Sequence, residues 1–172
     1  MLLKAHFCGN AASGFAPMAR RLLAILACVP MTLSAAQGLP AAENLAQDAG
    51  RMRAEALPMV VLYSQAGCTW CEEARRYLVP MSSAAETRDH ALYRQVDIDS
   101  DAALVDFEGT RTTHREFARV RKVRLTPTVV VYGPDGARIG EAIVGMRLPD
   151  FYGQYLSNAV DAARTTLKSR TR

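Results

Sequence analysis

The stretch that most constrains the fold reads Ala66-Gly67-Cys68-Thr69-Trp70-Cys71-Glu72-Glu73. Residues 58–63 before it are apolar and rich in β-branched side chains, which predicts a buried strand. Gly67 allows a sharp turn, and residues 69–78 are expected to form a helix that Cys68 caps. Unpaired N–H groups and the positive end of the helix dipole favour a thiolate at that position. A lone Cys-x-x-Cys is a weak motif, so its meaning depends on the rest of the chain.

The first 36 residues have a different charge pattern from the rest of the chain. They contain no Asp or Glu, and their basic residues are Lys4, Arg20 and Arg21. Residues 22–33 are nearly all apolar, and small residues follow up to Ala36. This pattern is typical of an export signal that is cleaved after Ala36. The apolar run is well short of the roughly 20 residues that a membrane-spanning helix needs.

Three further interpretations of this leader stay open. Translation starting at Met18 would make residues 1–17 an upstream extension. An uncleaved leader would anchor the protein to a membrane, and the segment ending at Cys28 weakly resembles a lipidation site. The expected location is periplasmic or otherwise exported, with either form of anchoring as the alternative.

Removal of the leader changes the charge and the cysteine content. The chain has 172 residues, 49% of them hydrophobic and 22% charged, as in an ordinary globular protein. Loss of the leader lowers the net charge from +4 to +1, which gives nucleic-acid binding little support. It also leaves Cys68 and Cys71 as the only cysteines, because Cys8 and Cys28 lie in the leader. A bridge that closes so short a loop stabilises a fold little, so a chemical role is favoured.

The remaining sequence predicts an alternation of helices and strands without internal repeats. A helix at 37–57 should precede a domain at 58–164, which a basic tail at 165–172 follows. Further expected elements are a strand at 92–98, a short helix at 102–107, a helix at 113–123, a strand at 128–132, its hairpin partner at 137–144, and a helix from Asp150. The core-facing residues expected on the last two helices are Phe117, Val120, Val123, Phe151, Tyr155, Leu156 and Val160. The fold class is α/β, with a mixed sheet, helices on both faces and an antiparallel C-terminal hairpin.

A second motif, Leu125-Thr126-Pro127-Thr128, stands immediately before the Val-rich strand. Proline is rare inside a sheet, so its position here suggests a special backbone conformation such as a cis peptide bond. The order of elements, the Cys-x-x-Cys at a helix start and this Thr-Pro-Thr resemble the thioredoxin superfamily over residues 58–162. Within it, the chain is similar to exported bacterial thioredoxin-like proteins, including those found with sulfur-oxidation systems.

The resemblance implies a role for each matching residue. Cys68 would be the exposed nucleophile, Cys71 the more buried resolving cysteine, and Pro127 a cis-proline facing them. Thr126 would hold the substrate backbone, while Thr69 and Trp70 would tune the redox potential and contact the substrate. The sequence departs from thioredoxin in three ways: Gly67 replaces the usual Trp, the dipeptide Thr69-Trp70 replaces Gly-Pro, and Leu62 stands where a buried acid is usual.

The implied activity is thiol-disulfide exchange, more as a reductase of substrate disulfides than as an oxidase. It needs no cofactor beyond the cysteine pair. Disulfide-containing proteins would be the substrates, and a separate, membrane-bound partner would supply the electrons. The protein itself is expected to be a monomer. One alternative is a metal site formed by Cys68, Cys71, His90 and His114, although the spacing is unlike common zinc modules. Another is a thioredoxin-like binding or chaperone module without turnover.

Overall fold

The computed structural model describes residues 38–146 and 149–170. The predicted leader lies outside these residues. The helices are α1 (Leu45–Glu55), α2 (Thr69–Ser83), α3 (His114–Val120), the 3-10 helix η1 (Pro149–Phe151) and α4 (Tyr152–Arg170). The strands are β1 (Met59–Ser64), β2 (Leu92–Asp97), β3 (Ala103–Val105), β4 (Arg111–Thr113), β5 (Thr128–Tyr132) and β6 (Ile143–Val144).

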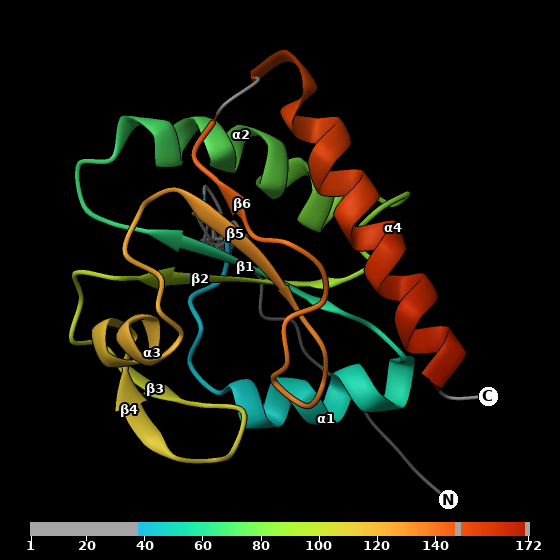
Figure 1. The fold of residues 1–172 in the computed structure, drawn as a ribbon, viewed down its shortest axis with the longest axis horizontal. Helices are drawn as coiled ribbons and strands as arrows, with labels where there is room; N and C mark the ends of the chain where they lie inside the picture. Colours follow the sequence, from blue (N-terminus) through green and yellow to red (C-terminus); the bar gives the residue numbers. More distant parts are fainter. Residues whose placement is uncertain (1–37, 147–148, 171–172) are drawn as a thin grey trace, which may run out of the picture. The chain divides into compact units, whose positions relative to one another are not determined.

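The central sheet has the strand order β2-β1-β5-β6 (Figure 1). β1 runs parallel to β2, with Met59 opposite Leu92, because α2 forms the crossover between them. β5 is antiparallel to both β1 and β6. The predicted mixed sheet with an antiparallel C-terminal pair is therefore confirmed.

Helices cover both faces of this sheet, and successive residues of β1 alternate between two cores. Met59, Val61 and Tyr63 pack with residues of α1 and α3. Val60 and Leu62 pack with residues of α2 and α4. Side chains alternate between the faces of a strand, so a strand covered on both sides is apolar throughout. This arrangement explains the uninterrupted apolar run before the cysteine motif.

The N-terminal helix is shorter than predicted, because the chain before it is extended. Ala41 bridges Gln95 at the outer edge of β2, and the amide of Gln95 donates to the carbonyl of Pro40 at 2.8 Å. The helix begins only after Asn44, whose side chain accepts from the amide of Gln47 at 2.9 Å.

The predicted helix at 102–107 is wrong: this segment contains β3, which pairs with β4 in a separate two-stranded sheet. The carboxylate of Asp106 accepts from the amides of Glu108 and Thr110 at 3.1 and 2.7 Å. Gly109 has a φ of 84°, which suits the tight turn between the strands. Local turn chemistry thus favours a hairpin over the helix.

Other boundaries also differ from the prediction. α2 continues through Pro80 to Ser83, and α4 continues to Arg170, inside the predicted tail. Of the strand predicted at 137–144 as the partner of β5, only β6 forms, together with one isolated bridge between Tyr132 and Arg138. No helix in the described part of the chain is both long and apolar enough to span a bilayer.

Three residues predicted to face the core are exposed instead: Val120, Phe151 and Tyr155. α3 ends at Val120, three residues earlier than predicted. Phe117 is buried within the helix, and Val123 is buried in the chain that follows it. α4 buries the series Tyr152, Leu156, Val160, Ala163 and Leu167. Phe151 and Tyr155 each precede a buried residue of this series by one position, about 100° around a helix, so they point away from the core.

Candidate active site

Cys68 caps α2, as predicted. Its backbone is extended, and its Sγ accepts from the amide of Cys71 at 3.1 Å. Its carbonyl accepts from the amides of Cys71 and Glu72 at 3.0 and 3.2 Å. Cys68 and Cys71 form a disulfide, with their Cα atoms 5.2 Å apart. The sulfur that opens the helix therefore lies where backbone N–H groups point outward.

The two cysteines differ in how far solvent reaches them. Cys71 is completely buried on the inner side of α2, whereas Cys68 is half-buried behind the exposed turn at Gly67. Gly67 has a φ of 68°, in the left-handed region that glycine adopts without strain. An incoming sulfur can therefore approach Cys68, while Cys71 is accessible only to Cys68.

The peptide bond between Thr126 and Pro127 is cis. β5 starts directly after it, and Thr128 pairs with Tyr63 near the end of β1. The chain leaves β1 at Ser64 and reaches Cys68 four residues later, so this register places Pro127 at the disulfide end of the sheet. The loop is held by two contacts: Thr128 Oγ1 donates to the Leu125 carbonyl at 2.7 Å, and the Gly145 amide donates to the Pro127 carbonyl at 2.8 Å.

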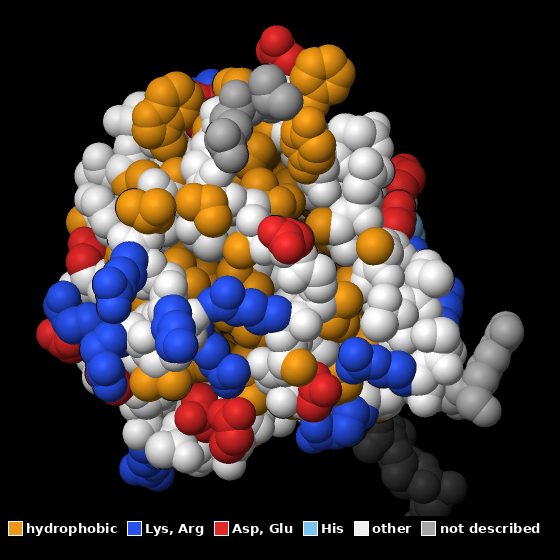
Figure 2. Space-filling model, viewed as in Figure 1, with side chains coloured by type: hydrophobic (Ala, Val, Ile, Leu, Met, Phe, Trp, Pro, Cys, Tyr) orange, Lys and Arg blue, Asp and Glu red, His pale blue; other side chains and the backbone are white. Residues whose placement is uncertain are grey.

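Apolar side chains are exposed around this end of the molecule. Trp70 is 58% exposed, so it does not pack into its own domain, and its neighbour Thr69 is exposed as well. Further exposed apolar residues are Leu125, Val144, Phe151 and Tyr155. Figure 2 shows hydrophobic side chains gathered where α2 and α4 begin. The sequence prediction missed Phe151 and Tyr155, because their spacing was assigned to the buried face.

A polar network lies at the same end of β1 and β2, where Leu62 itself is buried in an apolar core. Arg75, one turn after Cys71, donates from Nη2 to Ser64 Oγ and from Nε to Gln95 Oε1, each at 2.9 Å. Its Nη1 lies 2.7 Å from Glu72 Oε1. Arg75 was not among the predicted site residues; its spacing of four from Cys71 was the available signal.

The two acidic residues after Cys71 are paired within the helix. Besides the Glu72–Arg75 contact, Glu73 Oε1 lies 3.4 Å from Arg76 Nη1. Glu72, in the first turn of α2, also interacts favourably with the helix dipole. Both carboxylates are therefore paired with arginines of α2 itself.

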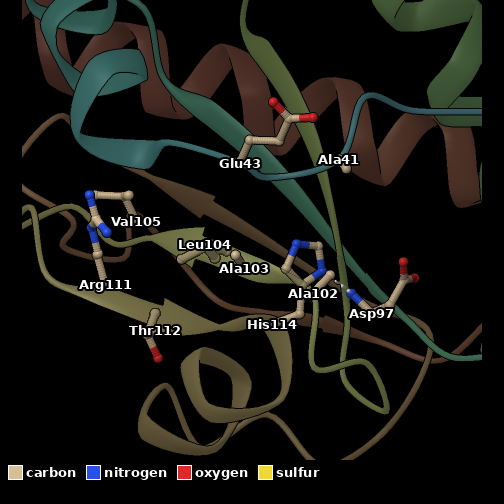
Figure 3. Close-up of a pocket in the computed structure, with 10 residues that line it drawn as sticks. All are labelled: Ala41, Glu43, Asp97, Ala102, Ala103, Leu104, Val105, Arg111, Thr112 and His114. Carbon is tan, nitrogen blue, oxygen red and sulfur yellow. Dashed lines mark hydrogen bonds between the residues drawn. The ribbon is translucent and has the colours of Figure 1, made fainter.

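His114, one of the histidines of the alternative metal set, is buried, since only 2% of it is exposed. Its Nδ1 accepts from the Asp97 amide, and its Nε2 is in hydrogen-bond contact with the Ala42 carbonyl, both at 3.0 Å. Figure 3 shows it beside Asp97 in a pocket of about 600 Å³ between the segment at Ala41 and the β3–β4 hairpin. Among the described residues, no three His, Cys, Asp or Glu lie close enough together to hold a metal. The proposed set of Cys68, Cys71, His90 and His114 is therefore not assembled.

Comparison with known proteins agrees with this architecture. Residues 45–159 match the family model described as a thioredoxin-like domain. Among solved structures, Fasciola hepatica thioredoxin aligns with a TM-score of 0.50 at 15% identity, covering 72% of this chain and 97% of that one. A mutant of a poplar thioredoxin h aligns with a TM-score of 0.51 at 13% identity, covering 73% of this chain and 84% of that one. No curated protein matches the sequence.

The fold and the helix-capping Cys68–Cys71 disulfide define a thiol-disulfide oxidoreductase of the thioredoxin type. The chain belongs to the thioredoxin-like domain family.

Proposed function

We propose that this protein is an exported oxidoreductase that reduces disulfides of other proteins in the cell envelope. The observation that carries the proposal is the asymmetric pair at the start of α2: Cys68 accessible, Cys71 buried, and the two joined by a disulfide. No dissociable cofactor is needed, because the cysteine pair itself stores two electrons. The charge pattern of the leader and the two cysteines that remain without it support an oxidising, extracytoplasmic location.

In the reducing direction, the thiolate of Cys68 attacks one sulfur of a substrate disulfide. The substrate S–S bond breaks, and its other sulfur leaves as a thiolate that takes up a proton. Cys71 then loses its proton and attacks Cys68, which releases the second substrate sulfur. The substrate gains two electrons and two protons, and the Cys68–Cys71 disulfide is restored.

The remaining site residues bind the substrate. We assign Thr126 and Pro127, at the disulfide end of β5, to hold the substrate segment, with Thr69 and Trp70 contacting it from α2. Trp70 offers a large, rigid apolar surface beside the reacting sulfur. A monomer recharged by a separate, membrane-bound thiol-disulfide partner completes the proposal, and nucleic acid has no part in it.

The activity is tested by reduction of a disulfide-bonded model protein such as insulin, with dithiothreitol as electron source. All variants carry Cys8→Ser and Cys28→Ser, so that only the α2 pair reacts. We expect Cys68→Ser to lower turnover to the background rate of dithiothreitol while leaving the circular dichroism spectrum unchanged. Turnover by Cys68→Ser equal to that of the parent protein would exclude the catalytic assignment.

The direction is tested by equilibrating the pair with glutathione redox buffers and quantifying reduced Cys68 after alkylation. Potentials in such proteins run from roughly −270 mV for reductants to −120 mV for oxidants. We expect a value near the reducing end. A value near −120 mV would instead assign an oxidase role to the same site.

A further inference from the structure

Three of the six basic residues from Arg111 to Arg124 form ion pairs within the described part of the protein: Arg115, Arg119 and Arg121. Arg115 Nε lies 2.8 Å from Asp101 Oδ1, and Arg119 Nη2 lies 2.6 Å from Glu116 Oε1. Hydrogen bonds from these guanidinium groups lower the pKa of Asp101 and that of Glu116. These cations therefore have acidic partners already.

Arg121 is also accounted for within the domain. Its guanidinium carbon lies 5.1 to 5.8 Å from the ring centroids of Phe107, Phe117 and Tyr132. Its Nη2 lies 3.5 Å from Glu108 Oε1. The side chain thus packs against the core on the α3 side through cation–π contacts and does not extend into solvent.

Three neighbouring cations remain without an acidic partner: Lys122, Arg124 and Arg138. None of them forms an ion pair with any residue in the described ranges 38–146 and 149–170. Lys122 and Arg124 are exposed in the connection after α3, and Arg138 donates to the carbonyl of Arg121. Figure 2 shows Lys and Arg side chains gathered beside hydrophobic ones on this face.

These three residues line one open groove of about 190 Å³, which we name the basic groove. The described residues that line it are Lys122, Val123, Arg124, Leu125, Thr128, Arg138, Ala142 and Val144, and none of them is acidic. Pockets for small-molecule ligands usually measure about 300 to 1,000 Å³. The basic groove is better suited to one or two side chains of a larger partner.

The basic groove is continuous with the cis-proline loop. Leu125, in its wall, directly precedes Thr126 and Pro127. On the other wall, Val144 pairs with Thr128, and the next residue, Gly145, donates to the Pro127 carbonyl. A polypeptide held at the loop with its cysteine at Cys68 would place neighbouring residues over this groove.

We propose that the basic groove selects protein substrates that carry acidic residues beside the reacting cysteine. The inference rests on the proposed function and adds a substrate class to it. Opposite charges at the rim of a binding site accelerate association by about tenfold or more at low ionic strength, and salt screens this effect. The groove thereby adds charge selectivity to the apolar contacts around Trp70 and Leu125.

The test uses two disulfide-linked peptides that differ only in the residues flanking one cysteine: Glu and Asp in one, Gln and Asn in the other. Reduction of each by the full-length, reduced protein is followed by stopped flow in the Cys8→Ser and Cys28→Ser background. We expect the acidic peptide to react about tenfold faster at low salt, and this preference to fall toward one in high salt. Equal rates for the two peptides at low salt would overturn the proposal.

Matched charge variants locate the effect. In the triple variant Lys122→Gln, Arg124→Gln, Arg138→Gln, the preference should be lost, and the double variant that keeps Arg138 should lose most of it. The control Arg51→Gln, Arg88→Gln, Arg170→Gln removes the same charge far from the groove in sequence and should retain the full preference. A preference that survives in the triple variant, or disappears in the control, would refute the assignment to this groove.

A binding measurement separates this proposal from the proposed function. The chain has a single Trp, so the fluorescence of Trp70 reports peptide binding to the oxidised protein without turnover. We expect analogues with Ser in place of Cys to bind more tightly when acidic, and the triple variant to remove the difference. If neither disulfide peptide is reduced, the proposed function fails, while equal binding of both analogues overturns the groove proposal alone.

Discussion

At the scale of single residues, Arg75 links the helix that carries the cysteines to the sheet. Its side chain contacts Ser64 of β1, Gln95 of β2 and Glu72 of its own helix, all within hydrogen-bond distance. Gln95 in turn donates from Nε2 to Asp97 Oδ1 at 2.7 Å. Because Ser64 is completely buried, its hydroxyl loses a hydrogen bond inside the protein when Arg75 is replaced.

Replacement of Arg75 should therefore destabilise the protein more than replacement of its neighbour. We expect Arg75→Gln to lower the free energy of unfolding by about 1–3 kcal/mol, the usual cost of leaving buried polar groups unpaired. The control Arg76→Gln removes an exposed ion pair with Glu73 and should change it by no more than about 0.5 kcal/mol. Urea unfolding of the oxidised proteins measures both values, and equal effects would contradict this role for Arg75.

At the scale of elements, β1 and β5 are joined by side chains as well as by their backbone ladder. The hydroxyl groups of Tyr63 and Tyr132 lie 2.6 Å apart in the buried core on the α1 and α3 side. On the other face, Tyr152 packs edge-on against Tyr77, with ring centroids 5.5 Å apart. The Tyr152 hydroxyl is buried and has no hydrogen-bond partner among the described residues.

Removal of these two buried hydroxyl groups should have different consequences. Tyr63→Phe leaves the Tyr132 hydroxyl unpaired and should cost about 1–3 kcal/mol of unfolding free energy. Tyr152→Phe keeps the ring contacts and removes an unpaired hydroxyl, so we expect no loss or a slight gain. Thermal unfolding of the two variants side by side decides the matter. A larger loss in Tyr152→Phe than in Tyr63→Phe would contradict the hydrogen bond between Tyr63 and Tyr132.

Sequence patterns identified the strands that are buried on both faces and the helix that begins at the cysteine motif. β1 and β5 are apolar on both faces, and Cys68 lies at a sharp break between strand and helix, so local pattern and tertiary position agree. The prediction failed where a distant contact or an unrecognised local turn decides the structure. His114 is buried because its ring joins Asp97 to Ala42, and β3 forms because Asp106 closes a turn. Two partners of Arg75, Ser64 and Gln95, come from β1 and β2, so no local pattern showed them.

At the scale of the whole molecule, buried tyrosines on both faces of the sheet make the fold sensitive to high pH. Burial raises the pKa of Tyr93 and that of Tyr152 to about 12, from an ordinary value near 10. Burial, together with the neighbouring Tyr132, raises the pKa of Tyr63 well above its ordinary value. All three phenols stay protonated in the folded protein over a range in which the unfolded chain loses their protons.

The stability of the protein should therefore fall at alkaline pH. The contribution of these tyrosines is fully present below about pH 10 and is lost as the pH rises toward 12, because only the unfolded state ionises there. Urea unfolding at a series of pH values measures the decline, and Tyr93→Phe should make it shallower. A free energy of unfolding that stays constant from pH 10 to 12 would contradict the burial of these groups.

The division of roles between the two cysteines is tested most directly by trapping. With Cys8 and Cys28 replaced by Ser, reduced protein is mixed with 5,5′-dithiobis(2-nitrobenzoate), and the released thiolate and the protein mass are followed together. We predict that the parent protein releases two thiolates and keeps no adduct. Cys71→Ser should react rapidly, release one thiolate and retain a stable mixed disulfide on Cys68, whereas Cys68→Ser should react far more slowly because Cys71 is buried. Rapid reaction of Cys68→Ser together with a slow Cys71→Ser would contradict Cys68 as the attacking thiol.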